Sequence, residues 1–211
     1  MAMGRAYKWI FLSFFFICQV GWAKYRDMNL TLSGAWNFGL GDYELLKNLY
    51  SYSLSFSYWM NNTSTVDLSV IRIEGGYDFE VLYNGSLSSK ENADWSMTIG
   101  TIGVRYHPEW DFFLNASIGA GMGYQAWQTS SDYFDTRHGE SAVYYALGNL
   151  EYPIEEWLSI GIFFQAFYFP LNTKIERKTE FTTTGTKEIF YDKIKDSWII
   201  STGLGINLKI R

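Results

Sequence analysis

The chain of 211 residues has few of the residues that staple small exported domains or build ordinary active sites: one cysteine, three prolines and two histidines. A single cysteine cannot form an internal disulfide bond, so burial and backbone pairing must hold the fold together. Charged residues make up only 18% of the chain, below the roughly 25% of ordinary soluble domains. The net charge of −5 argues against a nucleic-acid-binding protein, which needs a basic face.

Long apolar runs are also missing, except at the N-terminus. That segment carries basic residues, an apolar stretch and small residues at the cleavage positions: Arg5 and Lys8, then Trp9–Val20, then Gly21 and Ala23. This order predicts a cleaved secretory signal peptide over residues 1–23 and one domain over residues 24–211. An uncleaved anchor and a lipoprotein site at Cys18 are the alternatives. No later run is long enough for a membrane-spanning helix.

What the chain has in abundance is apolar and aromatic side chains at every second position. The pattern is clearest in five segments: 28–39, 50–60, 112–124, 158–168 and 198–210. Of their 32 even positions, 30 are apolar or aromatic, against 6 of 28 odd positions. A period of two is typical of a β-strand with two chemically different faces, so these segments are predicted to be strands.

Three less regular segments, 64–83, 95–107 and 141–152, complete a predicted set of eight strands. In 64–83 the apolar positions are even as far as Val70 and odd from Ile71 onward, and 95–107 changes phase in the same way. One extra residue in a strand shifts its phase, so we expect a β-bulge in each of these two segments.

The connections between the eight segments are of two lengths. Short turns are predicted at 61–64, 108–111 and 153–157, and long loops at 40–48, 84–94, 128–140 and 177–193. Because short and long alternate, an up-and-down meander places all the short turns at one end and all the long loops at the other. Outer-membrane barrels have this arrangement, with short periplasmic turns and long external loops.

The volume of the side chains indicates which face points outward. An eight-stranded barrel has an interior that side chains just fill, and the bulky aromatic set is too large for it. The odd positions are small, as in Ser51–Ser57 and Gly119–Gly123, and the even positions carry no charge. The fold class predicted is therefore an all-β, eight-stranded antiparallel transmembrane barrel with its apolar face toward lipid. A soluble, lipocalin-like barrel is the alternative.

Two groups of residues are predicted from this orientation. A charge cluster is expected in the lumen, with Glu74 and Arg105 facing each other across neighbouring strands, and the side of Arg72 is left open; the cluster consists of Glu74, Asp78, Arg105 and Glu151. Tryptophans near the strand ends are expected at the two membrane interfaces, where amphipathic rings are favoured. These are Trp36, Trp59, Trp95, Trp110, Trp127, Trp157 and Trp198.

Residues 28–210 resemble the small OmpA/OmpX-like eight-stranded barrels of bacterial outer membranes. The last strand is similar to the family's insertion signal, a polar-x-Gly-x-x-apolar-x-apolar pattern, at Ser201, Gly203, Ile206 and Leu208, although the chain ends in Ile210-Arg211 rather than in an aromatic residue. The resemblance implies export to the outer membrane, contact with outer-membrane lipids and lipopolysaccharide, handling by the barrel assembly machinery, and a monomer.

The resulting prediction of function is a non-enzymatic outer-membrane protein that serves envelope integrity, surface interaction or ligand contact through long external loops. Phosphate loops, metal-ligand clusters and nucleophile elbows are absent from the sequence, so no cofactor or metal is expected. Because some barrels of this size modify lipid A, an acyl-transferring or deacylating site at His138, Glu140 and Ser141 is one alternative. A narrow pore is the other, with at most slight ion leakage because bulky residues such as Phe163 and Phe167 are predicted to face inward.

Overall fold

The computed structural model describes the chain from residue 28 onward, in ranges separated by short gaps. The backbone is described for 28–41, 46–83, 86–109, 113–131, 134–170, 178–182, 185–189 and 197–210. Side chains are described over the same ranges apart from 77–83, 86–91, 131, 134–137, 178–182 and 185–189. The predicted signal peptide, 1–23, therefore lies outside the described residues.

Ten strands make up nearly all of the described chain. They are β1 (Met28–Leu40), β2 (Leu46–Asn61), β3 (Ser64–Tyr83), β4 (Ser86–Tyr106), β5 (Asn115–Ser131), β6 (Phe134–Glu155), β7 (Leu158–Phe169), β8 (Lys178–Thr182), β9 (Gly185–Ile189) and β10 (Ser197–Ile210). In the described part of the chain, no helix is both long enough and apolar enough to cross a membrane.

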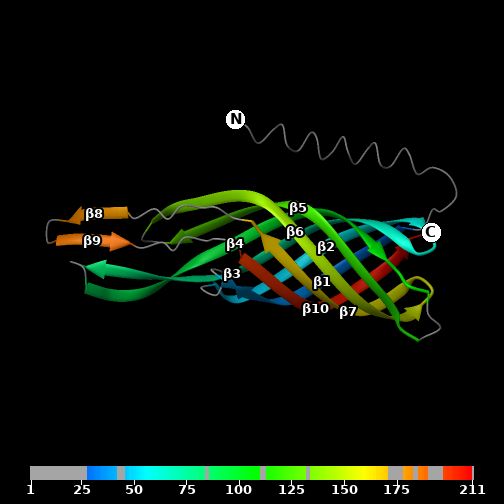
Figure 1. Cartoon of the computed structure of the whole chain (residues 1–211). Coiled ribbons are helices and arrows are strands. Elements are labelled where there is room, and N and C mark those ends of the chain that lie inside the picture. The colour runs from blue at the N-terminus through cyan, green and yellow to red at the C-terminus, as the bar shows by residue number, and fades with distance from the viewer. Residues whose placement is uncertain are drawn as a thin grey trace.

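Eight of these strands close into an antiparallel barrel (Figure 1). From β1 to β7 each strand pairs with the next one in the chain, β7 pairs with β10, and β10 pairs with β1. The ring has no open edge, because the pairing of β2 with β3 joins the two ends of the series. The eight-stranded fold expected from the sequence is confirmed.

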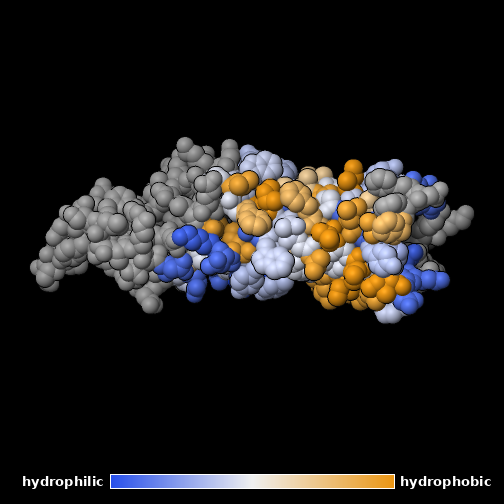
Figure 2. Space-filling model, turned by 90° about the horizontal axis from the view of Figure 1, so that it is seen from below, coloured by the Kyte–Doolittle hydropathy of each residue, from blue (hydrophilic) through white to orange (hydrophobic). Residues whose placement is uncertain are grey.

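The predicted orientation of the two faces is also confirmed. Leu54, Ile160 and Leu204, at even positions, are exposed by 48%, 46% and 62%. Apart from Lys47 and Asn61 near the ends of β2, odd positions on the same strands are buried or half-buried, as with Ser57 and Ser201. On the face that Figure 2 shows, apolar groups gather in a band across the barrel, with hydrophilic groups to either side of it. A contiguous apolar belt of this kind is stable when hydrocarbon surrounds it.

The predicted bulges in 64–83 and 95–107 are absent at the points where the apolar phase switches. The β3–β4 ladder runs without a shift from Ser64 to Val81, so the parity of every residue is kept through Val70 and Ile71. Ile71 is 4% exposed and faces the lumen, whereas Val70 is 57% exposed and faces outward. The apolar positions change from even to odd because the inward-facing residues of the strand are themselves apolar from Ile71 onward.

Two of the predicted long loops are also corrected. Of 84–94, all but residues 84–85 belong to strands, and of 128–140, all but residues 132–133 do. The ladders of β3–β4 and β5–β6 continue through these polar stretches. A backbone ladder needs only a partner strand, and beyond the lipid a strand no longer requires an apolar face, so the hydrophobic pattern stops before the strand does.

The loop between β7 and β10 contains a hairpin of its own. Strands β8 and β9 pair with each other, and β9 also pairs with the end of β3, where Val81 lies opposite Ile189 and Tyr83 opposite Lys187. In Figure 1 this hairpin and the β3–β4 hairpin extend from the loop end of the barrel, away from the short turns. We call β8, β9 and the paired ends of β3 and β4 the external sheet.

Glycine allows one large ring to lie inside this narrow barrel. Tyr145 on β6 passes over Gly103 and Gly121 on β4 and β5. A Cβ atom at Gly121 would overlap the carbonyl oxygen of Ile102 and lie 2.7 Å from the Tyr145 ring. Only a residue without a side chain lets the ring and the backbone approach so closely.

We predict that Gly121→Val destabilises the barrel by about 2 kcal/mol, because overpacking a filled interior usually costs 1–3 kcal/mol. Urea unfolding of the refolded protein in detergent, followed by heat-modifiable gel mobility, measures the difference. Gly148→Ala is the control, since a Cβ atom there meets nothing within 4 Å. Equal unfolding midpoints for the two variants would show that Tyr145 does not require the glycine.

Candidate functional site: the lumen and the outer rim

The lumen near the short turns is polar and is organised around a buried ion pair. Arg105 Nε donates to Asp67 Oδ2 at 2.7 Å, and the two side chains are only 9% and 4% exposed. Thr65 Oγ1 donates to the other carboxylate oxygen of Asp67 at 3.0 Å. Breaking such a buried pair costs about 3–5 kcal/mol, because it leaves an uncompensated charge in a medium of low dielectric.

Glu151 lies in the same half of the lumen and is held by neutral donors. Ser159 Oγ and Asn207 Nδ2 donate to its Oε2 at 2.8 and 3.0 Å, and Asn149 Nδ2 donates to Oε1. These donors provide hydrogen-bond partners for both oxygens of the carboxylate. The predictions that Arg105 and Glu151 face the lumen agree with this geometry.

A small cavity of about 50 Å³ lies between Asp67, Arg105, Glu151 and the serines of β1 and β2. This volume holds a few water molecules and is polar enough to bind them. No group of His, Cys, Asp or Glu suitable for a metal ion is found in the described ranges. The cavity is small compared with pockets that bind larger ligands, and we call it the vestibule.

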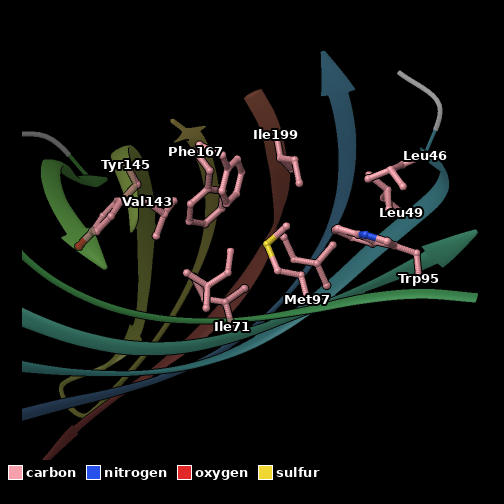
Figure 3. Packing of buried hydrophobic residues seen from close by; sticks show 12 residues of the cluster. Leu46, Leu49, Ile71, Trp95, Met97, Val143, Tyr145, Phe167 and Ile199 are labelled. Atoms are coloured by element: carbon pink, nitrogen blue, oxygen red, sulfur yellow. The ribbon is translucent and has the colours of Figure 1, made fainter. Parts of the chain in front are cut away.

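The loop half of the lumen is filled by an apolar cluster. Its side chains come from six strands and point toward one another inside the barrel (Figure 3). The members are Leu46, Leu49, Ile71, Ile73, Trp95, Met97, Ile99, Val143, Tyr145, Phe167, Phe169 and Ile199. Seven of these side chains have no exposed surface at all. The cluster separates the polar vestibule from the loop end of the barrel and closes the lumen.

A bulge in β2 completes this cluster. The register shifts between Lys47 and Tyr50, and Asn48 has a φ of 53°, in the left-handed region. The extra residue brings Leu46 and Leu49 to the same side, and both are buried. Gly75 on β3 makes room, since a Cβ atom there would lie 2.6 Å from Leu49 Cδ2.

His107 lies at the turn end of the barrel, just after β4. Its ring stacks on Trp59 at a centroid distance of 4.5 Å, and its Nε2 lies 3.4 Å from Thr65 Oγ1. Burial, together with repulsion from the Arg105 guanidinium, lowers the pKa of His107 to about 4. The ring is therefore neutral at physiological pH.

The structure corrects part of the predicted tryptophan girdle. Trp36, Trp157 and Trp198 are exposed by 68%, 57% and 45%, as expected for an interface. Trp95 is buried in the apolar cluster and Trp127 packs against it, because both have odd numbers and face the lumen. Trp59 also faces inward, onto His107. Trp110 lies outside the described residues.

Glu74 is likewise not in the lumen, contrary to the sequence prediction. It shares the outer face with Arg72, whose Nε donates to Glu74 Oε1 at 3.1 Å. Tyr50 Oη donates to Glu74 Oε2 at 2.9 Å from the neighbouring strand. Glu74 is paired in register with Ser96, and Arg105 with Thr65, so Glu74 and Arg105 do not meet. The side chain of Asp78 lies outside the described residues.

The alternative catalytic residues are not brought together. His138 and Glu140 have exposed side chains on the outer face of β6. Ser141 faces the lumen, where Gln125 Nε2 donates to its Oγ at 2.8 Å. A nucleophile and its base must be within hydrogen-bonding reach, and successive residues of a strand point to opposite faces. The geometry gives no support to acyl transfer by these three residues.

Sequence reasoning missed the apolar cluster, although a signal for it was present. Several of its members at odd positions are paired with one another across neighbouring strands, as Ile73 is with Met97 and Tyr145 with Phe167. Odd apolar residues grouped in this way on several strands indicate a lumen whose lining changes along its axis.

Comparison with solved structures finds the same architecture in small bacterial barrels. Neisserial surface protein A (NspA) superimposes with a TM-score of 0.60 at 10% identity, covering 87% of this chain and 97% of that one. A major outer membrane protein from Thermus thermophilus gives 0.55 at 14%, covering 87% and 99%. Ail, the attachment invasion locus protein of Yersinia pestis, gives 0.53 at 14%, covering 87% and 98%.

The chain has the fold of the small eight-stranded outer-membrane barrels. No protein-family model matches it, and a search of curated proteins finds no match. At identities this low the likeness shows the fold alone, so what this outer-membrane-type barrel does must be argued from its own residues.

We predict that the barrel gives no stepwise ion conductance in planar bilayers, because the apolar cluster excludes water from half of the lumen. Replacing Met97 and Phe167 together by alanine is expected to produce discrete conductance steps. As a control, Phe164→Ala removes a phenyl ring from the outer face of β7, the strand that carries Phe167, and should give no conductance steps. Porin-like steps from the unmodified protein would contradict a closed lumen.

We also predict that the His107 ring titrates near pH 4, as followed by its NMR chemical shifts in detergent micelles. The unfolded chain, with an ordinary histidine pKa of about 6.5, then binds more protons than the folded one. Stability is expected to fall as the pH drops from about 6.5 toward 4. His107→Gln should weaken this dependence of the urea midpoint on pH, and an unchanged dependence would contradict the assignment.

Proposed function

We propose that this chain is a non-enzymatic outer-membrane protein that presents the external sheet for contact with ligands at the cell surface. The observation that carries the proposal is that β3 and β4 extend beyond the apolar belt at the loop end of the barrel. Their ladder continues from the apolar belt to Tyr83 and Ser86, and β9 lengthens the sheet at its far end. Rigid scaffolds commonly carry function on the segments that project from them.

An outer-membrane location is supported by the apolar belt and by the solved structures that share the fold. Both described chain ends, at Met28 and Ile210, lie on the side of the short turns, since Met28 is paired with Ile210 and with Tyr58, close to the turn between β2 and β3. In such barrels the short turns face the periplasm. The external sheet would then project from the outer surface of the cell.

Two other functions receive less support from the described residues. A pore requires a hydrated lumen, whereas the apolar cluster fills the loop half of this one. A lipid A-modifying enzyme at His138, Glu140 and Ser141 requires side chains that converge, whereas strand parity separates Ser141 from the other two. Envelope integrity is compatible with the fold but gives no reason for strands that outreach the membrane.

The test shortens the projecting hairpin without disturbing the barrel. Replacing residues 80–90 by Asn-Gly joins Phe79 to Glu91, which are already paired in register, through a favoured two-residue turn. Attachment of bacteria carrying this variant to immobilised extracellular-matrix proteins and cultured cells is expected to fall to the level of bacteria without the chain. Heat-modifiable mobility confirms that the shortened barrel is inserted.

The matched control shortens the β5–β6 hairpin by replacing residues 130–136 with Asn-Gly between Thr129 and Arg137, which are also paired. This variant should retain most of the attachment, because it leaves the external sheet intact. Full attachment after the β3–β4 shortening would contradict the proposal. So would an acyl-chain difference in lipid A that depends on the chain and disappears with His138→Ala.

A further inference from the structure

A charged group on the outer face of the barrel calls for an explanation, because this face otherwise meets lipid. Arg72 and Glu74 both point outward from β3, with side chains 29% and 31% exposed. An arginine at the bilayer midplane costs about 2–4 kcal/mol, and the cost falls toward the interfaces. Such a residue is therefore expected at the level of the lipid headgroups.

The neighbouring rows of the sheet place Arg72 at that level. One outward position closer to the turns, Val70 is paired with Leu54 and Gly100, in an apolar row. Arg72 is paired with Tyr52 and Thr98, in a row that contains polar groups. Two residues of a strand tilted by roughly 40° rise about 5 Å along the membrane normal. The guanidinium thus lies just beyond the edge of the apolar belt.

The side chain of Arg72 is held in one orientation by its neighbours. Its Nε donates to Glu74 Oε1 at 3.1 Å, and its Nη1 donates to Thr98 Oγ1 at 2.8 Å. Guanidinium has five N–H donors, so three remain beyond these two bonds among the residues that the structure describes. A guanidinium fixed in this way loses little freedom when it binds another acceptor.

The charge of Glu74 is shared with two tyrosines rather than balanced by Arg72 alone. Tyr50 Oη donates to Glu74 Oε2 at 2.9 Å, and Tyr52 Oη donates to Oε1 at 3.5 Å. The Glu74 carboxylate thus accepts hydrogen bonds from three side chains. One of them is Arg72, whose guanidinium it holds in position. The free edge of Arg72 can still attract an anion.

We propose that Arg72 is the docking point for the phosphate group of an outer-leaflet phosphoglycolipid. Phosphate oxygens match the guanidinium fork in geometry and charge, and they lie at the height where Arg72 emerges. Tyr50 and Tyr52 flank the position as interfacial aromatics with an apolar body and a polar tip. The inference rests on the proposed outer-membrane location but not on the contact function of the external sheet.

The test uses the full barrel, refolded in detergent and transferred to phosphatidylcholine nanodiscs that contain purified lipid A. The number of lipid A molecules retained after gentle delipidation is counted by native mass spectrometry. The unmodified barrel is expected to retain diphosphorylated lipid A, and Arg72→Gln to lower its apparent affinity about tenfold, as loss of a charge-assisted bond should. Arg72→Lys should give an intermediate loss, because it keeps the charge without the fork.

Two controls separate the site from general electrostatics. Lys47→Gln removes another exposed cation near the loop end of the neighbouring strand and should not change retention. Lipid A stripped of its phosphates should not be retained, which identifies the phosphate as the recognised group. Free inorganic phosphate at millimolar concentration should not displace the lipid, which separates a lipid site from a site for any small anion.

Equal retention by Arg72→Gln and the unmodified barrel would overturn the inference, as would an equal loss with Lys47→Gln or full displacement by free phosphate. All variants must show heat-modifiable mobility, and Arg72→Lys retains a cation if Arg72→Gln does not fold. Failure of attachment through the external sheet leaves this readout untouched, so the two proposals fail separately.

Discussion

The whole structure depends on closure of the backbone ladder. Hydrocarbon offers no hydrogen-bond partners, so a membrane-spanning sheet must pair every N–H and C=O group with its own strands. Here the β1–β10 and β2–β3 pairings complete the ring. Once the backbone is satisfied internally, the outer face is free to be apolar along its full height, and residues such as Leu204 can be 62% exposed without cost.

Closure with eight strands also makes the interior narrow. The two halves of the lumen fill this narrow space with different kinds of side chain. Near the turns, Asp67, Arg105 and Glu151 are bound by hydrogen bonds around a small cavity. Near the loops, aromatic and aliphatic side chains exclude water. Polar groups in a confined space must be fully partnered, whereas apolar groups need only pack, so the apolar half forms the seal.

The unequal lengths of the strands determine which surfaces of the barrel extend beyond the lipid. Strands β3 to β6 are longer than β1, β7 and β10, so their outward positions pass from lipid into the headgroup region and beyond. Arg72 marks that passage on the outer face, and the external sheet lies above it. Both proposals, a contact point for lipid phosphate and a projecting surface for partners outside the cell, rest on this same extension.

The sequence by itself determined the strands of the lipid belt and which of their faces points outward. Bulky apolar residues at every second position, such as Leu54, Ile160 and Leu204, do not fit inside a narrow barrel and must therefore face the lipid. The sequence did not determine which residues of neighbouring strands are paired with each other. Alternation assigns a residue to a face but carries no information on height, so Trp95 resembled an interface residue, Glu74 a lumen charge, and the phase change at Ile71 a bulge. Only the cross-strand register, set by closure of the ring, placed Trp95 in the apolar cluster and Glu74 beside Arg72 on the rim.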